Sequence, residues 1–315
     1  MPLTPEQQAE IDRQRAETQP TRRAVSPGLE EILYQAIPVL DHGFVRVIDY
    51  MGDDAAVVQA ARVSYGKGTK KVNEDRGLIH YLMRHRHTTP FEMVELKFLI
   101  RLPIYVARQM IRHRTANVNE YSARYSVVPD EFDLPEPVAV RRQSARNRQG
   151  RDEALPPEVS ERFRTNLERV SADAYRSYSE ALEAGVARET ARLLLPLAYY
   201  TEWYWKTDLH NLFHFLSLRL DPHAQEEIRL YAVELAAAAR AVAPVATEAF
   251  EEFQLGGLDL SRREQRAVRA LLTGSTPEEA CAAAGLALRR EDGRPMTTGE
   301  GVEFLEKLER MRAPD

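Results

Sequence analysis

The chain has 315 residues but only one cysteine, Cys281. A single cysteine excludes a disulfide within the chain and is typical of a reducing compartment, so we expect a cytoplasmic protein. Long apolar runs are missing too, because no uninterrupted stretch reaches the roughly 18 residues that a transmembrane helix needs. Segment 1–28 is polar and rich in proline and lacks the apolar core of a secretory signal. We expect it to be a flexible tail with room for one short helix, and we expect no membrane association.

An excess of positive charge is also absent. The chain has 43 Lys and Arg against 48 Asp and Glu, which gives a net charge of -5. This balance excludes the global basic field that marks many nucleic-acid binders, so we expect no nucleic-acid partner. The chain has no G-x-G-x-x-G loop, which argues against a Rossmann dinucleotide site. Its 43% hydrophobic and 29% charged residues are ordinary for a globular protein.

The order of the expected elements indicates the fold class. Segments 44–50 and 93–101 alternate between apolar and polar residues, which predicts half-buried strands. The remaining pattern predicts a loop rich in proline and arginine over 129–157 and helices over 54–64, 73–85, 103–113, 158–184, 187–195, 200–218 and 222–253. Early strands and late helices favour an α+β fold, in which a small antiparallel sheet packs with helices and is followed by a helical region.

The run Arg112-His113-Arg114 stands at the expected end of helix 103–113. Three such side chains can fan out there and meet the partial negative charge of the helix C-terminus. A fan of this kind suits an anionic ligand with several oxygens, because arginine gives bidentate contacts. One turn earlier, Gln109 offers a donor and an acceptor together, as a pyrimidine edge does. A solvated basic helix end is the alternative interpretation.

The spacing of the residues around Arg112 favours a ligand site over a solvated helix end. Arg112-His113-Arg114, then seven residues, then Ser122, resembles the signature of the flavin-dependent thymidylate synthases, and the similarity extends through RQMIRHRTANVNEYSARYS. In that family the residues at Tyr121 and Ala123 act through backbone groups. The resemblance implies that dUMP is bound by Gln109, Ile111, Arg112, Glu120, Tyr121, Ser122, Ala123, Arg124, Arg192 and Arg219.

A second motif is His85-Arg86-His87-Thr88-Thr89-Pro90-Phe91-Glu92. Taken alone, its His-x-His pair is either a metal site or two surface histidines, and the second is commoner. The family has a similar His-x-x-x-Pro-Phe-Glu segment upstream of its Arg-His-Arg motif. The resemblance implies that FAD is bound by His87, Thr89, Glu92, Arg112, His113, Arg114, Glu120, Asp208, His210 and His214.

The third motif runs from Asp208 to Arg219. His210 and His214 have the i, i+4 spacing of a metal pair, but Asn211 replaces the glutamate of the zinc motif H-E-x-x-H. The string continues into LRLDPHAQ, which again resembles the family. This implies that Arg219 is the catalytic residue that favours the ionised uracil ring. Asp208 and His210 depart from the pattern, since some relatives carry Asn and Arg there.

The resemblance spans about residues 43–253 and implies reductive methylation of dUMP to dTMP. Methylenetetrahydrofolate would donate the carbon, FAD would carry a hydride from NADPH, and tetrahydrofolate would be released. It also implies a homotetramer with shared active sites and no metal. Cys281 independently disfavours the other class of thymidylate synthase, which attacks the uracil with a cysteine thiolate. The only cysteine of this chain lies in an alanine-rich segment outside the similarity. The runner-up is a metal-dependent hydrolase using His85, His87, His210 and His214.

Segment 255–315 lies beyond the similarity and predicts helices over 262–272, 277–284 and 299–312. Two helices joined by a short glycine turn faintly resemble a helix-turn-helix, so a non-enzymatic binding protein is a third hypothesis. Residues 261–315 contain ten basic and ten acidic residues, which disfavours DNA binding and favours a hairpin that packs on the body. We therefore expect a tail (1–28), a catalytic domain (29–254) and a helical extension (255–315).

Overall fold

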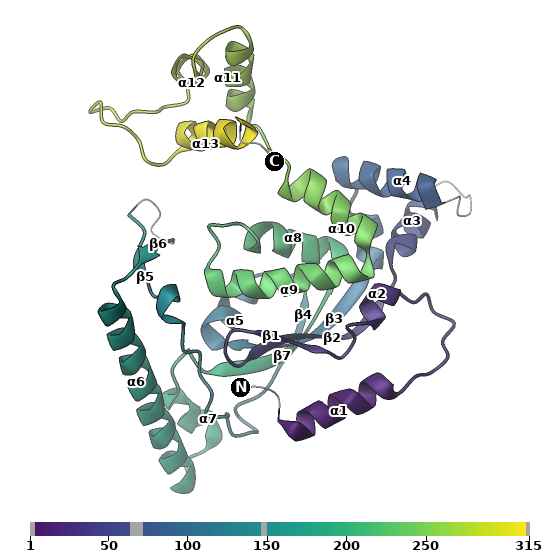
Figure 1. Ribbon diagram of the computed structural model, residues 1–315, viewed down its shortest axis with the longest axis vertical. Coiled ribbons are helices and arrows are strands. Elements are labelled where there is room, and N and C mark those ends of the chain that lie inside the picture. Colours follow the sequence, from purple (N-terminus) through teal and green to yellow (C-terminus); the bar gives the residue numbers. More distant parts are fainter. Residues whose placement is uncertain (1–3, 64–71, 146–149, 313–315) are drawn as a thin grey trace. The chain divides into compact units, whose positions relative to one another are not determined.

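The computed structural model describes residues 4–63, 72–145 and 150–312 (Figure 1). The chain divides into two compact units. The first comprises Met1–Arg142 with Arg151–Leu255, and the second comprises Gln143–Gly150 with Gly256–Asp315. Ser64, expected to end a helix, and residues 146–149 of the arginine-rich loop lie outside the described residues.

The first unit is built on a five-stranded antiparallel sheet with the strand order β1-β2-β3-β7-β4. The predicted α+β class with a small antiparallel sheet is confirmed. The predicted alternation also holds in β3, where Leu96, Phe98 and Ile100 are fully buried. The strands are β1 (Ala36–Val39), β2 (Gly43–Met51), β3 (Glu95–Pro103), β7 (Tyr200–Asp208) and β4 (Asn117–Glu120).

Strand β7 corrects the sequence analysis, which predicted one helix over 200–218. Residues 200–208 instead form a strand between β3 and β4, and helix α8 (Leu209–Arg219) begins after it. The segment YTEWYWKTD is rich in aromatic and β-branched residues, which favour strands. Trp203 and Trp205 are both buried in the sheet, and Trp205 is the register partner of Phe98. The sheet therefore takes one strand from the part of the chain that was predicted to be helical.

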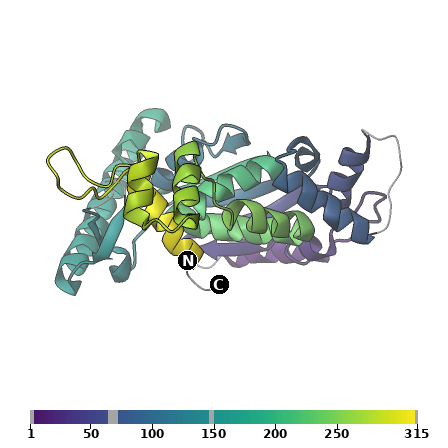
Figure 2. The same cartoon turned by 90° about the horizontal axis from the view of Figure 1, so that it is seen from above.

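Helices cover one face of this sheet (Figure 1), and α8 and α9 run side by side (Figure 2). The single helix predicted over 222–253 is divided by Pro244, because proline lacks the N–H that continues a helix. Three segments replace it: α9 (Glu226–Val242), α10 (Pro244–Phe250) and the π-helix η4 (Glu251–Leu255). The helix predicted over 103–113 is shorter, since α5 covers Ile104–Met110 with Pro103 as its N-cap.

The other elements of the first unit surround the sheet. Arg15 on α1 donates hydrogen bonds to the carbonyl oxygens of Leu33 and Glu31, which attaches this helix to the chain that follows. The flexibility expected of residues 1–28 stays a prediction. The elements are α1 (Pro5–Ala16), α2 (Pro27–Glu30), α3 (Asp54–Val63), α4 (Val72–Arg84), η1 (Thr89–Met93), η2 (Pro137–Ala139), β5 (Arg141–Gln143), β6 (Arg151–Ala154), α6 (Pro157–Glu183), α7 (Arg188–Ala191) and η3 (Arg192–Leu194).

The C-terminal unit has three helices close to the predicted positions: α11 (Arg262–Leu272), α12 (Pro277–Ala284) and α13 (Glu300–Arg312). Ser261 and Thr276 cap the first two with complete capping boxes. Gly285 ends α12 at φ 74°, a left-handed conformation that glycine adopts without steric cost. In the described part of the chain, no helix is long and apolar enough to cross a bilayer.

Candidate active site

A cavity of about 340 Å³ lies beside the Tyr200 end of strand β7. It forms because β4 pairs with β7 and aligns Glu120 with Trp203, and because the Tyr121 N–H then donates to the Glu202 carbonyl oxygen at 2.8 Å. The cavity brings together five residues predicted to bind dUMP: Glu120, Tyr121, Ser122, Ala123 and Arg192. The rest of the lining was not predicted: Ile104, Val128, Leu195, Tyr200 and Thr201.

Polar groups in and around this cavity are oriented by short contacts. The Thr201 hydroxyl donates to a Glu120 carboxylate oxygen at 2.7 Å. Ser122 Oγ accepts from the Arg124 backbone N–H at 3.3 Å. Arg192 Nε donates to the Glu189 carbonyl oxygen at 3.3 Å, while Arg124 Nε lies 3.3 Å from the Glu189 carboxylate. Hydroxyls and guanidinium groups around one cavity can bind an anionic ligand with several oxygens.

Two tyrosine–aspartate pairs involve Tyr200, which lines the cavity, and Tyr105, which follows the lining residue Ile104. Tyr200 donates to Asp41 at 2.6 Å, and burial raises the pKa of its hydroxyl well above the ordinary value, so it remains a donor. Tyr105 donates to Asp133 at 2.6 Å, and burial raises the pKa of that carboxyl to about 6. These pairs fix the cavity wall by hydrogen bonding. The role of Tyr200 was not predicted from the sequence, because residue 200 was expected to lie in a helix; the aromatic alternation of 200–208 is the signal of a strand.

A second set of predicted site residues, which includes His113, His214 and Arg219, lies where α5 and α8 end. Arg219 Nε donates to His113 Nε2 at 3.0 Å, and the His113 ring centroid lies 6.1 Å from that of His214. Burial, followed by the charges of Arg219 and His214, lowers the pKa of His113 to about 4. Burial also lowers the pKa of Arg219. A neutral imidazole therefore accepts a hydrogen bond from the arginine predicted to be catalytic.

The residues next to His113 leave several polar groups without protein partners. Arg112 and Arg114 are exposed, and no carboxylate of the described residues forms an ion pair with either. Gln109 Oε1 is buried and has no hydrogen-bond partner in the described chain. Ile111 is exposed at the C-cap of α5. A buried acceptor without a donor costs free energy, which fits a position where a ligand supplies the donor.

A third set of predicted site residues lies at the Asp208 end of β7, opposite the cavity. His87 and Thr89 are exposed near η1, Glu92 is half-buried, and Phe91 packs on Phe213 of α8 with centroids 6.4 Å apart. Asp208, which ends β7, and His210 at the start of α8 are half-buried. The eight steps between Tyr200 and Asp208 span about 26 Å at 3.3 Å a residue, so this group lies far from the cavity.

Asp208 has a local role as well. Its carboxylate accepts from the Asn211 backbone N–H at 2.8 Å and from the Asn211 side-chain amide at 2.6 Å. It therefore caps α8, a role that aspartate and asparagine fill equally well.

The alternative of a metal-dependent hydrolase finds no support. Its four histidines lie in two segments, with His85 and His87 after α4 and His210 and His214 on α8. Ring centroids of His85 and His87 are 6.4 Å apart. Among the residues that the structure describes, no group of three or more potential metal ligands comes together.

The fold is α+β, and a cavity lined by hydroxyl, carboxylate and guanidinium groups lies at one end of its antiparallel sheet. The sequence profile of the family described as "Thymidylate synthase complementing protein" matches residues 46–245. A flavin-dependent thymidylate synthase of Ruegeria pomeroyi is 59% identical over 278 residues, 87% of this chain and 92% of the relative. One of Rickettsia bellii is 55% identical over 267 residues, covering 81% and 91%. The chain belongs to the family of flavin-dependent thymidylate synthases.

Solved structures agree with this assignment. The crystal structure of a UMP/dUMP methylase, PolB from Streptomyces cacaoi, bound with 5-Br dUMP is similar at a TM-score of 0.63 and 34% identity. The similarity covers 69% of this chain and 98% of that chain. The same methylase bound with 5-Br UMP is 36% identical at the same TM-score of 0.63.

Proposed function

We propose that this protein catalyses the reductive methylation of dUMP to dTMP. The observation that supports this most directly is that Glu120, Tyr121, Ser122, Ala123 and Arg192, predicted from the motif, line one cavity. The relatives are named flavin-dependent thymidylate synthases, and the similar solved structure is a UMP/dUMP methylase bound with a dUMP analogue.

In this proposal the nucleotide is bound by groups of different chemistry. The hydroxyl of Ser122 and the guanidinium groups of Arg112, Arg124 and Arg192 bind the phosphate and sugar, because charge-assisted hydrogen bonds to phosphate are strong. The buried Gln109 Oε1 has no protein donor in the described chain and accepts a hydrogen bond from the pyrimidine. The other predicted contacts are Ile111, Glu120, Tyr121 and Ala123, together with Arg219.

Arg219 is the residue that we expect to act on the ring. Its guanidinium is held in place by the neutral His113 and is partly withdrawn from water. A preorganised cation of this kind stabilises negative charge that develops on the uracil ring during the reaction.

The flavin cofactor, which we propose is FAD, would supply hydride transfer when bound. The residues fit such a group, because Arg112 and Arg114 have no carboxylate partner in the described chain and a diphosphate needs cations. The predicted ligands are His87, Thr89, Glu92, Arg112, His113, Arg114, Glu120, Asp208, His210 and His214. NADPH as the reductant, methylenetetrahydrofolate as the carbon donor and cytoplasmic location belong to the same proposal.

We also propose that active sites are shared in a homotetramer. The cavity and the group around Glu92 and Asp208 lie at opposite ends of β7, so one copy does not gather all predicted ligands. Co-expressing an Arg192→Ala variant with a His87→Ala variant tests this. If different copies supply the two residues, hybrid oligomers regain part of the activity that each variant lacks. No recovery, together with a monomer in sedimentation velocity, would contradict sharing.

The function itself is tested with an absorbance spectrum of the purified protein, followed by anaerobic NADPH with and without dUMP. Flavin bands that bleach, and dTMP that forms once methylenetetrahydrofolate is added, are the expected result. A protein that takes up no flavin after incubation with FAD would overturn the proposal.

A further inference from the structure

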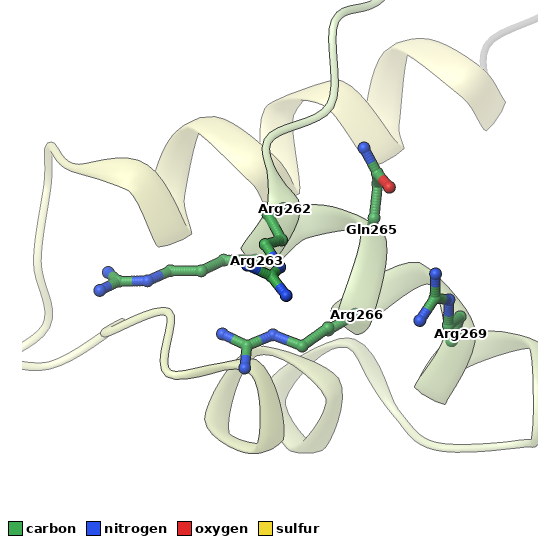
Figure 3. Close-up of a pocket in the computed structure, with 5 residues that line it drawn as sticks. All are labelled: Arg262, Arg263, Gln265, Arg266 and Arg269. Atoms are coloured by element: carbon green, nitrogen blue, oxygen red, sulfur yellow. The ribbon is translucent and has the colours of Figure 1, made fainter.

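Helix α11 of the C-terminal unit has a face of arginines. Arg262, Gln265, Arg266 and Arg269 are three or four residues apart, so they lie on one side of the helix. Together with Arg263 they line a cavity of about 510 Å³, and all five side chains are exposed. Figure 3 shows them projecting from α11. The lining therefore consists of four guanidinium groups and one carboxamide.

Most of this positive charge is not neutralised within the unit. Arg263 is the exception, since it pairs with Glu300 at 3.2 Å. In the described part of the chain, no carboxylate forms an ion pair with Arg262, Arg266 or Arg269. The one acid on α11, Glu264, is buried and binds Lys307 at 2.8 Å. The fold thus separates charges that sum to zero along the sequence.

The opposite side of α11 fixes the orientation of this face. Ala267 is fully buried, and Val268 and Leu271 pack into the core of the unit. The capping box at Ser261 satisfies the first turn of the helix. The arginines therefore stand on a packed helix, and the seven steps from Arg262 to Arg269 rise about 10 Å at 1.5 Å a step.

This spacing fits a row of phosphates. One strand of a duplex carries a charge about every 3.4 Å along the duplex axis, so about 10 Å of α11 laid along that axis spans roughly three phosphates. Arginine binds phosphate oxygens bidentately. Among the described residues of the lining, none has an aromatic or apolar side chain on which an unpaired base could stack, which disfavours single strands and free nucleotides.

We propose that the arginine face of α11 binds the phosphate backbone of a double-stranded nucleic acid without sequence preference. The balanced net charge had led to the opposite expectation, because a sum over the sequence does not show where charges lie. Contacts that reach only phosphates position a protein on a duplex and do not select a sequence.

The test uses the full-length protein and a fluorescent DNA duplex of about 20 base pairs, titrated by anisotropy from about 50 to 200 mM salt. With three phosphates neutralised, the logarithm of the association constant falls against the logarithm of salt with a slope of about -2.7. The variant Arg262→Gln/Arg266→Gln/Arg269→Gln weakens binding at low salt by about tenfold or more and flattens the slope. Glutamine keeps the helix propensity of arginine, and circular dichroism checks folding.

The matched control is Arg289→Gln/Arg290→Gln/Arg294→Gln, which removes the same charge from the exposed loop between α12 and α13. We expect it to bind within about twofold of the parent protein, since it leaves the phosphate contacts intact. Equal weakening by both variants, or no binding by the parent at low salt, overturns the proposal. So does binding to vesicles with phosphatidylglycerol but not to the duplex, or equal competition by inorganic triphosphate at matched phosphate concentration. An RNA duplex of the same length shows which nucleic acid is preferred.

Discussion

The two units of this chain bury cores of different composition. In the first, the largest fully buried side chains include Trp203, Trp205 and Phe98, and helices pack on a sheet around them. In the second, the buried hydrophobic residues of the core are three alanines, Cys281, Leu286 and Phe304. Aromatic side chains bury far more apolar area than alanine, so the first unit has many large contributors and the second depends on one. Each core contains residues of its own unit only, which makes the comparison testable.

The largest effect is expected from Phe304→Ala. Removing a buried phenylalanine costs about 3–5 kcal/mol, which is comparable to the whole stability of a small unit. Hydrogen exchange read by mass spectrometry should show loss of protection in α11–α13 and retained protection in β3 and β7. Leu272→Ala is the control, since Leu272 is 82% exposed and its removal should change stability by less than about 0.5 kcal/mol. Loss of protection in β3 would show that the cores are not independent.

Next in size is Arg219→Ala, which tests whether the chemistry lies in the first unit. We expect dTMP formation to fall by about 100- to 1,000-fold, because a preorganised charge on the reacting ring is lost. Arg219→Lys keeps a charge but not the Nε donor to His113, and should recover only part of the rate. Arg240→Ala, an exposed arginine paired with Glu251, serves as the control. An Arg219→Ala protein with turnover close to the parent would remove Arg219 from the site.

A smaller effect, on the pH dependence of stability, is expected from the protonation of His113. Its folded pKa of about 4 lies below the ordinary value of 6.5, so between these values the unfolded chain binds a proton that the folded protein does not. Stability contributed by this group is present above pH 6.5 and is lost as pH falls toward 4. Urea midpoints at pH 7 and about pH 5 should therefore differ more for the parent than for His113→Gln. Identical differences would show that His113 is protonated beside Arg219.

The smallest effect is expected from Cys281→Ala. The thiol is fully buried in the second unit, and burial followed by the charge of Glu278 raises its pKa, which disfavours the reactive thiolate. Alanine fills nearly the same space, so dTMP formation should stay within about twofold of the parent. An inactive Cys281→Ala protein that remains folded would mean that the second unit supplies a nucleophile.

Some of the fold could be predicted because the signals are local. Alternation in 93–101 predicts β3, and the helices predicted to begin at 262 and 277 begin at those residues, with Ser261 and Thr276 as their N-caps. Strand β7 was missed because its short apolar stretch runs directly into α8, and periodicity separates such segments poorly. Pro244 marks the break between α9 and α10 in the sequence, although one helix was predicted across it.

For the site, the sequence by itself determined which residues have the right chemistry, through the spacing from Arg112 to Ser122 and the strings around it. Only the tertiary structure decided that Tyr200 and Thr201 join that cavity, that Arg219 donates to a neutral His113, and that four arginines of α11 gather around a cavity. The physical reason is that hydrogen bonds, burial and charge neutralisation depend on distances between segments that pair far along the chain, and composition and local period do not encode those distances.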